Sequence, residues 1–279
     1  ADIYLWQEKY DDCLKMCDTV LNSGRFEFVE DGEQWFYLIF EEKYGTESVF
    51  ELEYNTTTAA GDNSKIRSTN NFLEWCITKT HFVPGETIVD LYKEVTGIND
   101  LRGGGASIAE FGSVLRLAKY AAFQSGSVMT ARSYGNANWI FYRVSDLLLM
   151  KAEALAMMQR YQESVDIVNK IRKRAGYLVD LSATNSELLA LELVMQERRR
   201  ELLMEGKRWF DVVRMAKKKD YQYKSYLIDV VLQGVSAAQR PRYESLLANP
   251  LSWYLPILQK QIDDNTGVLE QNPYYANEN

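Results

Sequence analysis

The sequence of 279 residues lacks a long uninterrupted hydrophobic run. Its richest apolar stretch, residues 147–158, is interrupted by Lys151 and Glu153. A membrane-spanning helix needs about 20 consecutive apolar residues, so we expect none in this chain. The chain starts at Ala1 with neither an initiator methionine nor a basic segment followed by an apolar signal core. We therefore expect a processed or excised piece of a longer protein, with any targeting segment out of view.

Cysteine and histidine are scarce, which weakens any metal hypothesis. The chain has 3 cysteines, Cys13, Cys17 and Cys76, and a single histidine, His81. Cys13 and Cys17 are four residues apart on an expected helix, as metal ligands can be, but no CxxC pair accompanies them. Small buried core residues are the favoured interpretation, and His81 is expected at the surface. We expect neither a metal nor a cofactor.

An excess of positive charge is also absent. The chain has 32 Lys and Arg against 39 Asp and Glu, a net charge of −7. Affinity for a phosphate backbone comes from clustered cations, so we expect no nucleic acid partner. No P-loop, GxSxG, HExxH or calcium-loop motif occurs, and Gly103-Gly104-Gly105 is interpreted as a loop. The 46% content of hydrophobic residues is typical of a folded globular protein.

Two segments repeat one pattern at an offset of 151 residues, which aligns Tyr10 with Tyr161. Residues 1–26 and 152–177 each contain a helix end, a short polar turn, an aromatic residue and a second amphipathic helix. The pattern resembles the helical hairpin of tetratricopeptide repeats, although any two patterned hairpins share part of it. Because such units cannot bury their faces alone, we expect further hairpins before Ala1 or other helices that cap these two.

The remaining segments predict a mainly α-helical chain with long loops and a few short strands. Residues 49–54 alternate apolar and polar side chains, as a half-buried strand does, and residues 35–40 are apolar and expected to be buried. Residues 55–70 are polar and predict a loop. The helices are expected at 86–95, 143–158, 161–175 and 186–217, with Ser186 capping the last one.

A charged block follows within the last of these helices. Glu197, Glu201 and Glu205 lie at four-residue intervals and would share one helix face. Two such carboxylates could act as acid and base in glycoside hydrolysis. Arginines interleave with the acids between residues 198 and 214, and an arginine beside a carboxylate keeps it ionised. The block therefore favours a structural ion-pair network between helices over a catalytic pair.

Aromatic residues are abundant, with 6 Trp, 18 Tyr and 11 Phe. Sugars pack their C–H faces on such rings, while amide and guanidinium groups bind the hydroxyls. Trp209 and Trp253 lie in dense apolar sequence and are expected in the core. For Trp75 and Tyr134, beside polar loop sequence, ligand binding and burial in the core are equally open interpretations. The candidate ligand-binding residues are Trp75, Phe72, Asn71, Tyr134, Arg132 and Asn136.

Three sequence blocks, in this order, resemble the SusD/RagB family. They are NWIFYRVSDLLLMKAEALA at 138–156, QERRREL with EGKRWFDVVR at 196–214, and WYLPI with QNPYY between 253 and 275. Ser145 stands where the family usually has Ala, and Leu258 where it usually has Pro. Family members are typically about twice this length, so the chain resembles their carboxy-terminal half to two-thirds. The acylated cysteine of the family is not Cys13, which lies within a helix.

The resemblance implies a SusD-like α-solenoid of tetratricopeptide-like hairpins, forming a single domain over 1–279. We divide it into a hairpin at 1–26, a loop-rich subdomain at 27–137 and a helical scaffold with its tail at 138–279. The resemblance also implies an outer-membrane lipoprotein that faces outside and delivers glycans, less often peptides, to a TonB-dependent transporter without cleaving them. Membrane contact would be only through a lipid anchor outside this chain. The family blocks are scaffold, and ligand contacts lie in variable loops. A glycoside-acting enzyme and a helical-repeat scaffold that binds protein segments are the alternatives.

Overall fold

The computed structural model describes residues 1–54, 76–77, 81–93, 100–125, 128–133, 137–182 and 184–276. The chain packs as two compact units, Ala1–Arg208 and Trp209–Asn279. It is mainly α-helical with a few short strands, which confirms the predicted fold class. Within the described ranges, no helix combines the length and the apolar character needed to cross a bilayer.

Both predicted hairpins are present in the first unit. They consist of α1 (Asp2–Trp6) with α2 (Tyr10–Leu21), and α6 (Val144–Met157) with α7 (Tyr161–Arg174). Glu8 and Gln159, which are 151 residues apart, have positive φ angles of 58° and 61°. This conformation is uncommon for residues other than glycine, so its recurrence shows that the two hairpins share a turn geometry as well as a hydrophobic pattern. Tyr10 and Tyr161 each begin the second helix of their hairpin.

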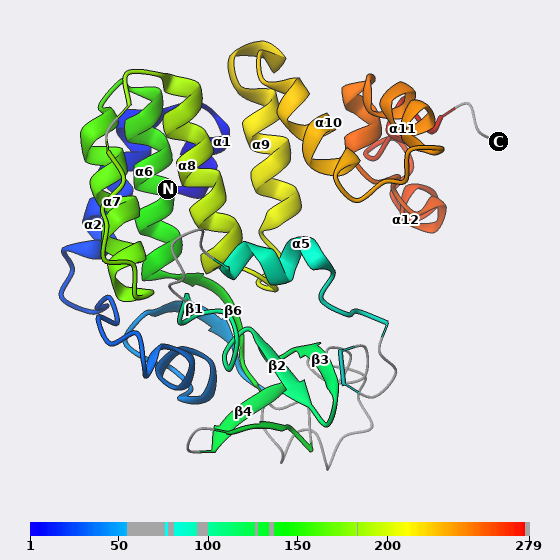
Figure 1. Ribbon diagram of the computed structural model, residues 1–279. Helices are drawn as coiled ribbons and strands as arrows, with labels where there is room; N and C mark the ends of the chain where they lie inside the picture. Colours follow the sequence, from blue (N-terminus) through cyan, green and yellow to red (C-terminus); the bar gives the residue numbers. More distant parts are fainter. Residues whose placement is uncertain are drawn as a thin grey trace. The chain divides into compact units, whose positions relative to one another are not determined.

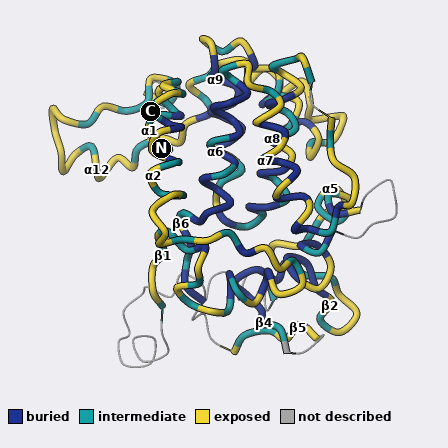
Figure 2. Tube along the Cα trace, turned by 90° about the vertical axis from the view of Figure 1, so that its left-hand side faces the viewer, coloured by how far each residue is buried: buried dark blue, intermediate teal, exposed yellow. Residues whose placement is uncertain are grey.

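Helix α6 is the centre of this unit and contacts α2, α7 and α8 (Glu187–Glu201), which run beside it (Figure 1). Figure 2 shows α6 buried along most of its length. Its sequence is apolar on nearly every side, as a helix surrounded by others requires. Ala152, Ala154 and Ala156 are fully buried, and their small side chains let the neighbouring helices approach closely.

The cysteines occupy the core, as predicted. Cys13 and Cys17 of α2 pack against α6, and Cys76 lies in a separate buried cluster. A hydrogen bond with Cys13, together with burial, raises the pKa of the Cys17 thiol. Burial raises the pKa of Cys76 to about 11. Thiols with raised pKa values stay protonated at neutral pH and are poor metal ligands. His81 is exposed, also as predicted.

The predicted helix 186–217 is wrong in one respect, because it is interrupted by a turn. Helix α8 ends at Glu201 and α9 (Arg208–Tyr221) begins seven residues later. Between them Met204 and Gly206 have positive φ angles of 66° and 74°. The apolar periodicity continues through this segment, which is why it predicted one helix, but α8 ends at Glu201 and the left-handed backbone at Met204 and Gly206 separates it from α9. The predicted cap is confirmed, since the Ser186 hydroxyl accepts a hydrogen bond from the amide of Leu189 at 3.4 Å.

The strands lie at one end of the helices of the first unit (Figure 1). Among the described residues they form antiparallel pairs β1–β6, β2–β3 and β4–β5. The predicted strand at 49–54 is confirmed as β1. The helix predicted at 86–95 is shorter, since α5 (Glu86–Val89) continues only as the 3₁₀ turn Asp90–Tyr92. The strand bounds are β1 Ser48–Leu52, β2 Ile108–Phe111, β3 Val114–Leu117, β4 Ala122–Ser125, β5 Val128–Ala131 and β6 Trp139–Arg143.

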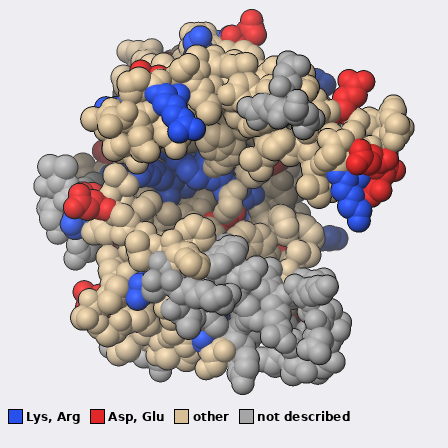
Figure 3. All heavy atoms as spheres, turned by 90° about the vertical axis from the view of Figure 1, so that its right-hand side faces the viewer, with Lys and Arg blue, Asp and Glu red and all other residues tan. Residues whose placement is uncertain are grey.

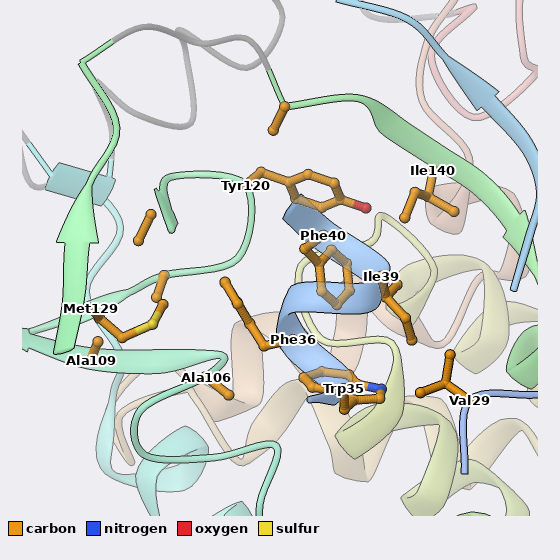
Figure 4. Packing of buried hydrophobic residues seen from close by; sticks show 13 residues of the cluster. Val29, Trp35, Phe36, Ile39, Phe40, Ala106, Ala109, Tyr120, Met129 and Ile140 are labelled. Carbon is orange, nitrogen blue, oxygen red and sulfur yellow. The ribbon is translucent and has the colours of Figure 1, made fainter. Parts of the chain in front are cut away.

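A cluster of aromatic rings joins these strands to the segment 35–40 (Figure 4). The predicted burial of this segment is confirmed for Trp35, Phe36, Ile39 and Phe40 but is wrong for Tyr37, which is 47% exposed. Phe40 lies between Trp35 and Tyr120, with ring centroids 5.3 and 5.4 Å away and both pairs edge-on. Tyr120 in turn stacks on Trp139 of β6 at 4.9 Å. Edge-to-face and offset pairs are favoured arrangements of aromatic rings, so this cluster forms a rigid core beneath the strands.

The second unit contains short helices and an irregular tail. Trp253 is buried, as predicted, and its ring meets Tyr221 edge-on at 5.6 Å. The prediction that Trp209 lies in the core is wrong, because its side chain is 42% exposed. Its apolar sequence context was misleading, since the buried residues of α9 include Val212 and Val213 but not Trp209. The helices of the second unit are the part of α9 after Arg208, α10 (Lys224–Leu232), α11 (Arg240–Leu247), the 3₁₀ turn Pro250–Trp253 and α12 (Gln259–Asp264).

Substituting Gly32 tests how closely segment 26–47 packs on α7. A Cβ atom at Gly32 would lie 1.9 Å from the carbonyl oxygen of Arg174 and 2.9 Å from Leu101 Cδ1. We expect Gly32→Ala to lower the free energy of unfolding by about 1–3 kcal/mol, as overpacking does. Gly104→Ala is the matched control, because nothing lies within 4 Å of its Cβ position. It should change stability by less than about 0.5 kcal/mol. Urea unfolding measures both, and equal stabilities would contradict the close packing.

Candidate functional site

Glu201, the last residue of α8, is fully buried among three arginines. Its Oε1 accepts a hydrogen bond from Arg143 Nη1 at 2.5 Å, and its Oε2 accepts one from Arg102 Nη1 at 2.8 Å. Arg174 Nη2 lies 2.5 Å from the same Oε2. Burial alone would raise the pKa of Glu201, but the attraction of Arg174, Arg143 and Arg102 holds it well below its usual value.

Further charged side chains extend this contact into a carboxylate–guanidinium network in which the opposite charges nearly balance. Arg143 also binds Glu205 and Glu47, and the buried Lys119 donates a hydrogen bond to Glu205 Oε1 at 2.9 Å. Lys119 lies over the ring of Phe40 at 4.8 Å, which connects the network to the aromatic cluster. The network consists of Glu47, Asp100, Arg102, Lys119, Arg143, Arg174, Glu197, Glu201 and Glu205.

This geometry confirms the predicted ion-pair network around Glu197, Glu201 and Glu205. A catalytic acid needs a pKa raised towards the working pH. Burial raises the pKa of Glu205 as well, but Arg143 and Lys119 lower it overall. Both carboxyls are therefore held ionised and out of solvent. The expectation that all three acids share one helix face is wrong for Glu205, which lies beyond the end of α8 and reaches the network from the turn that follows this helix.

The sequence analysis missed the partners of these acids. Arg102, Arg143 and Arg174 bind Glu201 from segments that lie 99, 58 and 27 residues away. No local pattern connects residues so distant. Arg143 lies inside a family block, but nothing in its immediate sequence marks it as a partner of Glu201.

Most of the candidate ligand-binding residues lie outside the described residues: Asn71, Phe72, Trp75, Tyr134 and Asn136. Arg132 is described, and its guanidinium is occupied by the backbone. Its Nε donates to the carbonyl of Ala122 at 3.0 Å and its Nη2 to the carbonyl of Phe40 at 3.2 Å. Burial lowers the pKa of Arg132, and the attraction of Glu41 offsets part of this lowering. Arg132 thus ties the end of β5 to β4 and to the aromatic cluster, and its contact with a ligand stays a prediction.

The chain segments that flank the two candidate loops lie side by side. Residues 55–75, which include the predicted loop 55–70, follow β1, and residues 134–136 precede β6. These two strands pair with Leu52 opposite Trp139. The amide of Tyr54 donates to the side-chain oxygen of Asn138 at 3.0 Å, which closes the pair at this end. The described residues that flank the two candidate segments therefore lie at one end of the same strand pair.

The sequence analysis also missed a pocket lined mainly by basic and polar side chains. It has a volume of about 240 Å³ and lies between α7, α8 and the residue that follows Asp90–Tyr92. No composition signal marked it, because its residues come from separate segments of an acidic chain. We call it the basic pocket; its lining residues are Lys93, Arg172, Leu181, Leu193, Gln196, Glu197 and Arg200. In the described part of the chain, no group of three His, Cys, Asp or Glu side chains could hold a metal ion.

The fold defines a helical scaffold whose charged block is structural. The model of the SusD family matches residues 93–275 of this chain. The chain therefore belongs to the SusD family, which confirms the resemblance of its three sequence blocks.

Known relatives agree with this assignment. The SusD-like protein P38 of Formosa agariphila is 36% identical over 110 residues, which cover 37% of this chain and 21% of that protein. A SusD superfamily protein from Bacteroides vulgatus aligns with a TM-score of 0.66 and 20% identity, over 94% of this chain and 58% of its own. Surface glycan-binding protein A from Bacteroides thetaiotaomicron, in complex with laminarihexaose, aligns with a TM-score of 0.64 and 20% identity, over 98% and 62%. This chain spans less than two thirds of each relative.

Removing the charge of Glu201 tests the network. Glu201→Gln removes the one carboxylate that Arg102, Arg143 and Arg174 share, so we expect the free energy of unfolding to fall by about 3–5 kcal/mol. Glu163→Gln is the control, because Glu163 makes an exposed ion pair with Arg160 within one helix and should change stability little. Denaturant unfolding compares the variants. If Glu201→Gln were as stable as the unchanged chain, Glu201 would not hold the unit together.

The pH dependence of stability gives an independent test. A carboxyl whose folded pKa is lowered stabilises the fold above its ordinary pKa, 4.5 for Glu201, and loses this contribution as the pH falls through its folded value. We therefore expect the stability difference between the unchanged chain and Glu201→Gln to be constant from pH 7 to about pH 5. Below pH 4.5 it should shrink. Unfolding curves measured at each pH check this, and a difference that grows on acidification would contradict it.

Proposed function

We propose that this chain belongs to a non-catalytic glycan-binding protein of the outer-membrane surface, which delivers its ligand to a TonB-dependent transporter. The observation that carries the proposal is the pairing of β1 with β6, which brings together the flanks of two loops with aromatic and polar residues. Membership of the SusD family supports it. The fold similarity to a surface glycan-binding protein solved with laminarihexaose also supports it.

The carboxylates support the non-catalytic part of the proposal. A glycoside hydrolase needs one carboxylic acid with a raised pKa facing the substrate. Glu201 and Glu205 are buried, bound to cations and have lowered pKa values, so they lack both properties. Membrane attachment in this proposal is through a lipid anchor outside the chain, and the ligand is an oligo- or polysaccharide.

Affinity electrophoresis on gels that contain single polysaccharides tests the proposal. We expect at least one polysaccharide to retard the full-length protein, and Trp75→Ala or Tyr134→Ala to reduce this retardation. Loss of a central ring costs about 2 kcal/mol or more, which is about thirty-fold in Kd. Trp209→Ala and Tyr243→Ala are matched controls, because both rings are exposed and belong to the second unit. These controls should bind like the unchanged protein.

Two outcomes would favour the alternatives. New reducing ends after incubation with a polysaccharide would indicate a glycoside-acting enzyme. A protein that no polysaccharide retards, but that still binds protein segments after Trp75→Ala and Tyr134→Ala, would be a helical-repeat scaffold.

A further inference from the structure

The basic pocket concentrates positive charge within a chain whose net charge is −7. Figure 3 shows one face of the molecule, on which some Lys and Arg side chains form a group and others stand apart. Arg172, Arg200 and Lys93 line the pocket. They differ in depth, because Arg172 is 6% exposed, whereas the side chains of Arg200 and Lys93 are 21% and 65% exposed. The pocket therefore offers cations from its inner wall to its rim.

Neighbouring groups hold the two arginines in place. The guanidinium of Arg172 lies over the ring of Tyr177 at 3.9 Å, which orients its plane. Burial and, to a smaller extent, the negative charge of Asp100 raise the pKa of Tyr177 to about 12, so its hydroxyl stays protonated and the ring neutral. Arg200 donates from Nε to the carbonyl of Leu91 at 3.1 Å. Fixed guanidinium groups suit carboxylate and sulfate groups, which they bind through paired hydrogen bonds.

One acidic side chain, that of Glu197, lines the pocket, and Arg102 of the network offsets its charge. Its Oε1 accepts a hydrogen bond from Arg102 Nη1 at 2.6 Å within the network. Its Oε2 is buried and accepts no hydrogen bond from the described residues, and the nearest cation, Arg200 Nη1, is 3.6 Å away. Glu197 is fully buried between Arg102 and Arg200, which offset its negative charge, so the lining of the pocket keeps a net positive charge. At the rim, Asp90 pairs with Lys93 in an exposed contact that solvent screens.

The size and walls of the pocket limit its ligand. Its volume of about 240 Å³ is smaller than the roughly 300–1,000 Å³ of pockets for drug-sized molecules. It therefore suits one sugar residue and not a length of chain. Leu181 and Leu193 provide apolar surface for the C–H face of such a ring.

We propose that the basic pocket binds one acidic sugar residue, whose carboxylate or sulfate group is held by Arg172, Arg200 and Lys93. This proposal rests on the glycan-binding function above and names its ligand class as an anionic glycan. The pocket is formed by side chains other than those of the two candidate loops.

Titration of the protein, followed by nuclear magnetic resonance or calorimetry, tests the proposal with five probes: D-glucuronate, D-glucose 6-sulfate, D-glucose, acetate and inorganic sulfate. We expect an acidic sugar to bind at least about tenfold more tightly than D-glucose. D-glucose lacks the anionic group, and one charge-assisted hydrogen bond accounts for a difference of this size. Whichever acidic sugar binds more tightly identifies the anionic group. Acetate and inorganic sulfate should bind more weakly than that sugar, because they have no ring to pack on Leu181 and Leu193.

Variants locate the binding in the pocket. Arg200→Gln should weaken binding of the acidic sugar at least about tenfold, and Lys93→Gln several-fold, since its exposed charge is screened. Lys173→Gln is the matched control, because it removes an equally exposed lysine of α7 that does not line the pocket. It should bind like the unchanged protein. Thermal unfolding checks that each variant is folded. If Arg200→Gln does not fold, the binding measured with Lys93→Gln decides the result.

Three results would overturn the proposal: equal binding of D-glucose and both acidic sugars, binding that Lys93→Gln and Arg200→Gln leave unchanged, or acetate or inorganic sulfate binding as tightly as the sugars. The last would reveal a site for small anions only. Affinity electrophoresis with neutral polysaccharides distinguishes failure of the pocket proposal from failure of the proposed glycan-binding function. A protein retarded by a neutral glycan but unable to bind either acidic sugar keeps the function and loses the pocket proposal.

Discussion

The contact on which the first unit depends is the buried carboxylate of Glu201 among Arg102, Arg143 and Arg174. Removing such groups from water costs several kcal/mol for each ion, and only close, well-oriented partners offset it. The three arginines belong to three separate segments, so their contacts with one carboxylate are satisfied together only in one arrangement of those segments. The end of α8 is thereby held against the end of β6 and the end of α7. Hydrophobic contacts alone would be less selective, because they are not directional.

The same network fixes the strand pair that carries the candidate loops. Glu47 immediately precedes β1 and Arg143 ends β6, and these two residues are bound to each other. In the antiparallel pair, Ser48 lies opposite Arg143 at this end, and Leu52 lies opposite Trp139 at the other. The network anchors one end, and the loops leave from the other. A rigid base of this kind limits the ordering cost that binding must offset, since the scaffold is arranged before a ligand arrives.

The features that could be predicted from the sequence are those with local signals. The hairpins follow from helical periodicity and from aromatic residues at Tyr10 and Tyr161, and β1 follows from alternation over a few residues. The break between α8 and α9 was not predicted, because the apolar pattern continues through it and Gly206 is its one sequence signal for a left-handed turn. Glu197 and Glu201 indicated an ion-pair network, yet its arginines and the basic pocket come from distant segments and leave no local pattern. Sequence alone therefore located the acids but not their partners.

Glu197 connects the two polar features of this unit. One of its oxygens is bound to Arg102, which also binds Glu201, and its other oxygen is the one without a donor beside the basic pocket. Its carboxylate is therefore held by the network and cannot turn to find a donor elsewhere. Ser145, where the family usually has Ala, adds a hydrogen bond from its hydroxyl to Glu47 Oε2 at 2.9 Å and stiffens the same network further. The contacts of Glu197 with Arg102 and with Arg200 thus join the network to the wall of the basic pocket, so in this chain the charges that hold the scaffold also position a cation of the pocket.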